Sequence, residues 1–145
     1  MTVEIAETRD IALCRKLRRI VFIEEQGVSE ADELDDKDDE AVHLLAQEAG
    51  VALGSARLLE DGQTGKIGRV CVLAEGRGRG IGAALIRAGV AHFRQRGLAS
   101  VKLGAQTHAL GFYAALGFHP MGEVYDDAGI PHRDMILDLR VDRAD

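Results

Sequence analysis

The stretch GRGRGIG, residues 76–82, most constrains what this chain can fold into. It alternates glycine with arginine or isoleucine, and the residues that follow, 83–96, favour a helix at almost every position. Glycine loses more backbone entropy on folding than other residues, so such a cluster suits a loop that needs positive φ or the close approach of another molecule. A helix N-terminus presents unpaired N–H groups and the positive end of the helix dipole, which favours phosphate. The stretch therefore predicts a phosphate-binding loop at the start of a helix.

Length and composition indicate one domain with an ordinary soluble composition. The chain has 145 residues, of which 46% are hydrophobic and 29% are charged, and this length allows one buried core. No apolar run is long enough for a membrane span, and the N-terminus lacks the features of a secretory signal. Cys14 and Cys71 lie in apolar segments without metal-ligand spacing. We therefore expect two reduced thiols, no metal, no membrane partner and a cytoplasmic location.

Charge is distributed unevenly along the chain. Residues 24–40 hold ten carboxylates and one lysine, whereas residues 76–122 hold six basic residues and no carboxylate. One part of the protein is therefore suited to an anion and another to a cation. The net charge of −6 argues against nucleic acid as a partner. For the acidic segment we expect a loop or an irregular helix with some mobility.

The hydrophobic periodicity predicts an α/β protein with the order β-α-ββ-β-α-β-α-ββ. Thr8 is expected to cap the first helix, which runs to about Glu25. The later helices are expected at 80–96 and 107–116, and the strands at 2–5, 41–48, 51–60, 66–73, 100–105, 118–125 and 131–139. This order indicates a mixed sheet with helices on both faces.

Two common glycine-loop motifs fit the stretch poorly. A Walker A loop requires Gly-Lys-Ser/Thr at its end, but here Gly82 is followed by two alanines. The spacing Gly78-x-Gly80-x-x-Ala83 matches the loose dinucleotide fingerprint, which also needs an acidic residue about 20 positions later for the ribose. The first acidic residue after the loop is Glu123. A nicotinamide-binding oxidoreductase is therefore the least favoured of the functions considered.

A third pattern, Arg-x-x-Gly-x-Gly over residues 77–82, resembles the loop of the GNAT superfamily of acyl-CoA-dependent N-acyltransferases. The family has a strand just before this loop, and RVCVLAEGRGRGIGAALI fits that arrangement. Beyond the next strand it has a polar residue seven positions before a tyrosine, followed by Leu-Gly-Phe. Gln106, Tyr113 and the stretch FYAALGF (112–118) match, with Gln106 where the family usually has asparagine. The resemblance covers essentially the whole chain.

Within the superfamily the chain looks most like the ElaA/YjcF type. The stretches that carry this narrower match are RRIVFIEEQGV (18–28), LGAQTHALGFY (103–113) and GEVYDDAGIPHRDM (122–135). The resemblance implies a single GNAT domain over residues 1–145, with a central, mostly antiparallel, splayed β-sheet and helices on both faces. The resemblance is compatible with a homodimer.

The resemblance also implies where acetyl-CoA binds as cosubstrate. Backbone N–H groups of residues 77–82 would cradle the pyrophosphate, and the exposed edge of strand 70–72 would pair with the pantetheine arm like an added strand. Cys71 needs no chemical role, because its neighbours supply no base to activate it. The residues expected to bind the cosubstrate are Val70, Cys71, Val72, Arg77, Gly78, Arg79, Gly80, Ile81, Gly82, Gln106 and Phe112.

The reaction implied by the resemblance is transfer of an acetyl group to a primary amine by direct attack through a tetrahedral intermediate. Tyr113 matches the residue that protonates the leaving sulfur, and a tyrosine is protonated at neutral pH. The sequence leaves the general base open: Glu25, His43, His108, His132 or a water chain could serve. The strand before the loop offers no carboxylate among residues 66–69.

The acceptor is expected to be a small molecule that contacts Glu25, Gln26 and His132. The acidic residues 24–40 would concentrate cationic acceptors if this segment lines the cleft, and a solvated surface loop without substrate contact is the alternative. A CoA-binding sensor or regulatory module with the same fold and no turnover is the second candidate function. Tyr113 at the acid position favours the enzyme.

Overall fold

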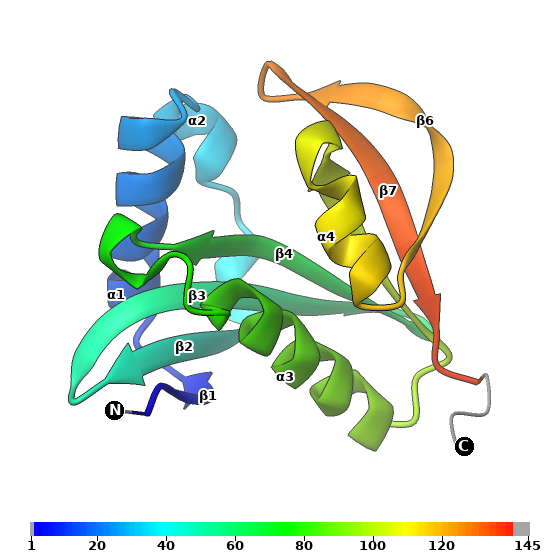
Figure 1. The fold of residues 1–145 in the computed structure, drawn as a ribbon, viewed down its shortest axis with the longest axis horizontal. Helices are drawn as coiled ribbons and strands as arrows, with labels where there is room; N and C mark the ends of the chain where they lie inside the picture. Colours follow the sequence, from blue (N-terminus) through cyan, green and yellow to red (C-terminus); the bar gives the residue numbers. More distant parts are fainter. Residues whose placement is uncertain (1, 141–145) are drawn as a thin grey trace.

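The structure, a computed structural model that describes residues 2–140, confirms the predicted mixed α/β order (Figure 1). Its strands are β1 (Glu4–Thr8), β2 (Val42–Glu48), β3 (Val51–Asp61), β4 (Thr64–Val72), β5 (Ser100–Gln106), β6 (His119–Asp127) and β7 (Ile130–Asp138). Its α-helices are α1 (Ile11–Arg18), α2 (Glu30–Glu33), α3 (Ile81–Gln95) and α4 (Leu110–Ala115). A π-helical segment, Arg19–Glu25, continues α1, and single 3₁₀ turns occupy Asp38–Glu40, Ala74–Gly76 and Thr107–Ala109. Across the described range, no helix is long and apolar enough to cross a membrane.

The strands form one seven-stranded sheet in the order β1-β2-β3-β4-β5-β7-β6. Its neighbouring strands are antiparallel except β4 and β5, which are parallel. The parallel pairing covers only Thr64–Lys66 against Ser100–Lys102. Beyond these residues the two strands diverge, so the sheet is splayed as expected and opens between β4 and β5 (Figure 1).

Helices cover both faces of the sheet, because the strand side chains alternate between two apolar clusters. On β2, Leu44 and Ala46 belong to the cluster that contains the buried face of α3. Leu45 points the other way and packs with Leu17 of α1 and Val21 of the π-helical segment. Figure 1 shows α3 crossing one face of the sheet, with α1 and α2 on the opposite face.

The start of the first helix differs from the prediction. Thr8 is the last residue of β1, where its backbone pairs with His43 of β2, so the sheet holds it extended. Asp10 caps the helix instead, and its carboxylate accepts a 3.0 Å hydrogen bond from the Leu13 amide. Sheet pairing therefore decides between two acceptable capping residues.

The acidic segment is ordered by arginines and is not a solvated loop. Carboxylates of Glu33, Asp35 and Asp38 form ion pairs with arginines of α1, β3 and β4. Arg18, Glu33 and Asp38 are at most 2% exposed. We call this set the arginine–carboxylate cluster, and its members are Arg15, Arg18, Glu33, Asp35, Asp38, Arg57 and Arg69. The segment is irregular, as expected, with a short helix and a 3₁₀ turn, and Glu33 and Asp38 anchor it in the interior.

Candidate active site

A free backbone edge of β4 forms one side of the cleft. Because β5 leaves β4 after Lys66, the later residues of β4 have a strand partner only on the β3 side. Leu73 donates its backbone N–H to the carbonyl of Leu53 in β3 at 2.8 Å, so the preceding residue Val72 turns its N–H and C=O groups toward the open side. The carbonyl of Val72 accepts a 3.0 Å hydrogen bond from Nε of Arg77. This edge can accept an extended ligand as an added strand.

The glycine loop joins β4 to α3 and has the conformation that its glycines suggest. Gly78 and Gly80 both have φ of +77°, a region that L side chains rarely adopt. Gly80 is the N-cap residue of α3, and its carbonyl accepts from the amide of Ala84. The first N–H groups of α3 therefore point toward the loop without helical partners.

Both arginines of the loop are tied to acidic side chains. Arg77 forms an ion pair with Glu25 of the π-helical segment. Arg79 forms a 2.7 Å ion pair with Glu48 of β2. Both arginines remain part-exposed at 47% and 37%, so either one can turn to an incoming anion at small cost. The ion pair with Arg77 also places Glu25 beside the glycine loop.

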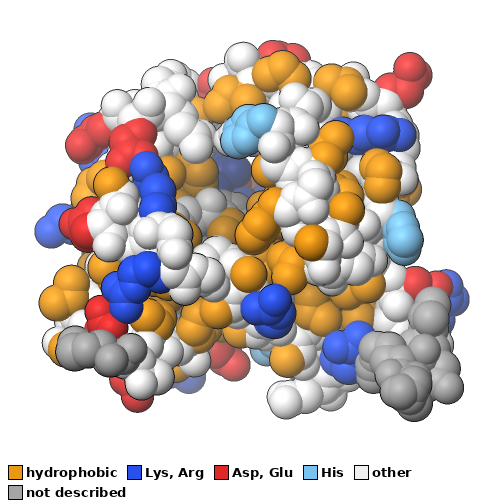
Figure 2. Space-filling model, viewed as in Figure 1, with side chains coloured by type: hydrophobic (Ala, Val, Ile, Leu, Met, Phe, Trp, Pro, Cys, Tyr) orange, Lys and Arg blue, Asp and Glu red, His pale blue; other side chains and the backbone are white. Residues whose placement is uncertain are grey.

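A cavity of about 410 Å³ lies where β4 and β5 separate. Figure 2 shows the surface hollowed between the α1–α2 side and the part formed by α4, β6 and β7. Among the predicted site residues, those that line the cavity are Gln26, Val70, Gln106, Tyr113 and His132. The others, including Glu25 and the loop residues 77–82, lie outside the lining. The cavity and the glycine loop therefore occupy different parts of the molecule, and Val70 of β4 belongs to the cavity lining.

Tyr113 of α4 stands on the wall of this cavity. Its ring packs edge-on against Phe112 and Phe118, at centroid distances of 4.9 and 6.3 Å. Burial raises the pKa of the Tyr113 hydroxyl, so that it keeps its proton at neutral pH. Phe112 lies beside the start of α3, since a Cβ on Gly82 would be 3.8 Å from its Cζ. Helix α4 thus connects the glycine loop to the cavity.

Cys71 is not placed for chemistry. Its side chain is 3% exposed and packs in the apolar cluster under α1. Burial raises the pKa of the Cys71 thiol to about 12, which leaves it protonated and inert. The expectation that Cys71 needs no chemical role agrees with this burial, and its backbone pairs with Ser55 of β3.

The β6–β7 hairpin forms the far wall of the cavity. Tyr125 of β6 stacks on His132 of β7 at 6.0 Å and an interplanar angle of 25°. The Tyr125 hydroxyl donates a 2.6 Å hydrogen bond to Asp134, and a Cβ on Gly104 would lie only 2.6 Å from that hydroxyl oxygen. The glycine in β5 is therefore needed for the hairpin to close over the strand.

The four side chains considered as general base lie in different parts of the molecule. His43 is buried in the arginine–carboxylate cluster region, with Nε2 donating to the carbonyl of Asp38 at 2.9 Å. His108 donates through Nε2 to Oε1 of Gln106 at 2.7 Å and lies outside the cavity lining. Of the four candidate side chains, the structure places His132 alone in the cavity.

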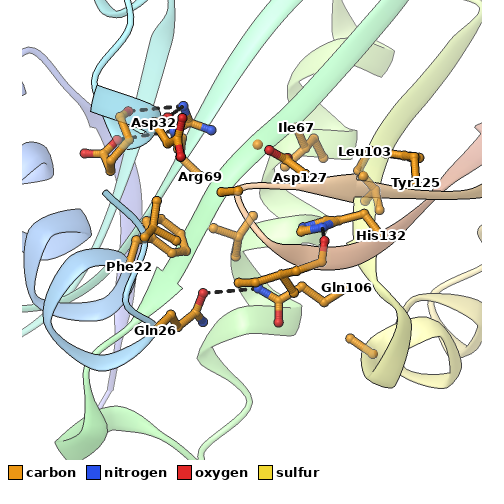
Figure 3. A pocket seen from close by; sticks show the side chains of 18 of the residues that line it. Phe22, Gln26, Asp32, Ile67, Arg69, Leu103, Gln106, Tyr125, Asp127 and His132 are labelled. Carbon is orange, nitrogen blue, oxygen red and sulfur yellow. Dashed lines mark hydrogen bonds and ion pairs between the residues drawn. The ribbon is translucent and has the colours of Figure 1, made fainter. Parts of the chain in front are cut away.

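Several polar residues of the lining were not singled out from the sequence as functional. Asp32 and Arg69 lie on the side of α2 and β4, whereas Tyr125 and Asp127 come from the hairpin (Figure 3). Arg69 sits at a bulge in β4 with φ of +49°, and it binds the carboxylate and the carbonyl of Glu33. Tyr125 and Asp127 lie in the same stretch as His132, GEVYDDAGIPHRDM. Their closeness to His132 in the sequence was the one feature that could have indicated a place in the site.

The comparisons with known proteins agree with this geometry. A family model described as "Acetyltransferase (GNAT) domain" matches residues 21–139. The chain is 34% identical over 132 residues to Escherichia coli protein ElaA, covering 86% of this chain and 84% of ElaA. It is 34% identical over 124 residues to the uncharacterized N-acetyltransferase YjcF of Bacillus subtilis, covering 84% of this chain and 88% of YjcF.

Solved structures show the same fold. The crystal structure of Escherichia coli ElaA superposes with a TM-score of 0.82 at 28% identity, covering 94% of this chain and 99% of ElaA. An acyl-CoA N-acyltransferase from Pseudomonas aeruginosa superposes with a TM-score of 0.81 at 28% identity over the same shares. The splayed sheet, the glycine loop and these matches together define an acetyltransferase class. The chain belongs to the GNAT acetyltransferase family.

Proposed function

We propose that this protein transfers an acetyl group from acetyl-CoA to a primary amine of a small acceptor. The observation that carries the proposal is the early end of the β4–β5 pairing, which leaves a free strand edge between a helix N-terminus and Tyr113. Acetyl-CoA supplies an activated thioester, and the chain supplies binding, orientation and proton transfer.

The residues on the cosubstrate side fit a long, phosphorylated and amide-containing molecule. The free edge of β4 at residues 70–72 suits the amides of a pantetheine arm. The loop at Gly78–Gly82, with two left-handed glycines and the N-terminus of α3, suits a pyrophosphate. Arg77 and Arg79 would exchange their present carboxylate partners for phosphate oxygens.

Tyr113 is the proposed general acid. It lines the cavity close to the end of the free strand edge, and its raised pKa keeps the hydroxyl protonated. Within residues 2–140 it has no hydrogen-bond partner that would compete for this proton. The hydroxyl can therefore protonate a thiolate as it leaves.

The charge of the cavity supports an acceptor that carries a second positive group. Glu33, Asp35 and Asp38 of the acidic segment are neutralised within the arginine–carboxylate cluster, so the segment 24–40 as a whole is not the attracting element. Asp32 and Asp127 line the cavity, and neither forms an ion pair within the described chain. A diamine or an aminosugar has the chemistry to meet these two carboxylates.

A thiol-release assay with acetyl-CoA and a panel of primary amines tests the proposal. The panel pairs neutral, acidic and cationic acceptors of similar size. Turnover with at least one amine supports the enzyme, with the highest kcat/KM expected for a cationic acceptor. Tight acetyl-CoA binding without turnover on any amine would favour the CoA-binding sensor instead.

A further inference from the structure

His132 projects from β7 into the cavity, and one of its ring nitrogens is already hydrogen-bonded to the backbone (Figure 3). Its Nδ1 lies 2.7 Å from the carbonyl oxygen of Ile130. Because a carbonyl oxygen only accepts hydrogen bonds, Nδ1 carries the hydrogen. In the neutral ring the lone pair is then on Nε2, the nitrogen that can take up a proton.

Neighbouring strands hold this ring in place from both sides. Tyr125 stacks on the imidazole, and the tyrosine is itself fixed by its hydrogen bond to Asp134. On the other side, His132 is the direct cross-strand partner of Gln106 at the end of β5. The imidazole is therefore positioned by β5, β6 and β7 together, and not by a mobile loop.

We infer that His132 is the general base of the acyl transfer, acting through Nε2; this inference rests on the proposed function. The acceptor nitrogen forms a C–N bond to the acyl carbon and gives one N–H proton to Nε2. The C–S bond breaks with its electron pair on sulfur, and Tyr113 supplies the proton that makes the thiol. Proton exchange with water then returns the imidazolium and the tyrosinate to their starting forms, so the transfer is balanced.

The same cavity holds other titratable groups that face His132. On the hairpin and α4 these are Tyr125, Asp127 and Tyr113, and across the cavity they are Asp32, Glu33 and Arg69. Glu33 is bound by Arg18 and Arg69, so it is not available as a base.

The first test is a comparison of His132→Asn with the wild-type protein. Asparagine retains an N–H donor near the position of Nδ1 but has no base at Nε2. We expect kcat/KM to fall about 10²- to 10⁴-fold, because the acceptor nitrogen then lacks the group that takes its proton. Acetyl-CoA affinity should stay within twofold. The control is His119→Asn on β6, an exposed histidine outside the cavity lining, which should leave kcat/KM unchanged.

The second test needs no turnover. In ¹⁵N-labelled protein, side-chain NMR should report the Nδ1–H tautomer for His132 and the Nε2–H tautomer for His43 and His108, assigned through single His→Asn variants. An Nε2–H tautomer at His132 would overturn the inference. So would a kcat/KM for His132→Asn within twofold of wild type. A wild-type chain that acetylates no amine would overturn the proposed function and this inference with it.

Discussion

Gln106 and His132 are directly opposed across the β5–β7 pair, at the end of β5 that has separated from β4. Gln106 also donates a 3.2 Å hydrogen bond to Gln26, which follows the π-helical segment on the opposite side of the cleft. The Gln106 amide thus links the hairpin side of the cavity to the α1 side. This link explains why a glutamine, longer than the asparagine usual in the family, can be accommodated here.

The glycine loop is best tested at Gly82, because its backbone is not in the left-handed region. A Cβ there would meet Phe112 and Val72 at 3.8 and 3.9 Å, which is ordinary contact, whereas Gly80 has φ of +77° and any side chain would strain it. Gly82→Glu should weaken acetyl-CoA binding at least about tenfold, because a carboxylate would stand at the phosphate site. Gly82→Gln, of the same size and neutral, is the matched control. Calorimetric affinities that are equal for the two variants would place the phosphates elsewhere.

Tyr113→Phe removes the proposed acid and keeps the ring contacts with Phe112 and Phe118. We expect kcat to fall about 10²- to 10⁴-fold while acetyl-CoA affinity is retained. Steady-state kinetics at several pH values measure the effect. Unchanged turnover in Tyr113→Phe would mean that another group protonates the sulfur.

The attraction of cationic acceptors is assigned to Asp32 and Asp127. With both changed to Asn, kcat/KM for a diamine should fall about fivefold at low ionic strength, since each exposed ion pair contributes about 0.5 kcal/mol. Added salt should reduce the wild-type value in the same way. The control is the double variant Asp36→Asn with Asp39→Asn, which removes the same total charge from exposed positions outside the cavity and should leave kcat/KM nearly unchanged. If kcat/KM falls equally in both double variants, the net charge of the protein and not the cavity carboxylates attracts the acceptor.

Stability at low pH should depend on Asp38. Burial by itself would raise the pKa of this carboxyl, but hydrogen bonds from Arg18 and Arg15 outweigh it and hold the pKa well below its ordinary value near 3.8. The folded state therefore binds fewer protons than the unfolded state. The free energy of unfolding should be constant above this ordinary value and fall as the pH drops below about 4.

Asp38→Asn breaks the buried ion pairs while leaving the arginines in place. We expect a loss of about 3–5 kcal/mol in the free energy of unfolding at pH 7, measured by urea denaturation. Asp39→Asn, an exposed neighbour, should change it by less than about 0.5 kcal/mol. A small loss for Asp38→Asn would mean that water compensates the freed arginines.

The strands and the long helix could be predicted because their signals are local. Alternation on β2 and β3, the glycines at 76–82 and the stop at Gly97 all act over a few residues, and the observed boundaries of β2, β3 and α3 differ from those expected by about one residue. The cap at Asp10 could not be predicted in this way. It depends on the pairing of β1 with β2, which holds Thr8 in the sheet.

The arginine–carboxylate cluster shows a second limit of reading the sequence. Ten carboxylates in residues 24–40 suggest a solvated loop, yet Glu33, Asp35 and Asp38 form ion pairs with arginines of α1, β3 and β4, distant in the sequence. One local signal existed: Arg18 lies four residues after Cys14 on the apolar face of α1, and such a position is buried. An arginine there requires buried carboxylates.

The central claim is tested most directly by following the acetyl group itself. The protein is mixed with acetyl-CoA labelled with ¹³C at the carbonyl and with a cationic primary amine, and the label is followed by NMR. We predict that the thioester signal is replaced by that of an N-acetyl amide, with one equivalent of free thiol per amide, and that Tyr113→Phe slows this replacement. A label that stays in the thioester with every amine tried, while the protein binds acetyl-CoA, would contradict the account.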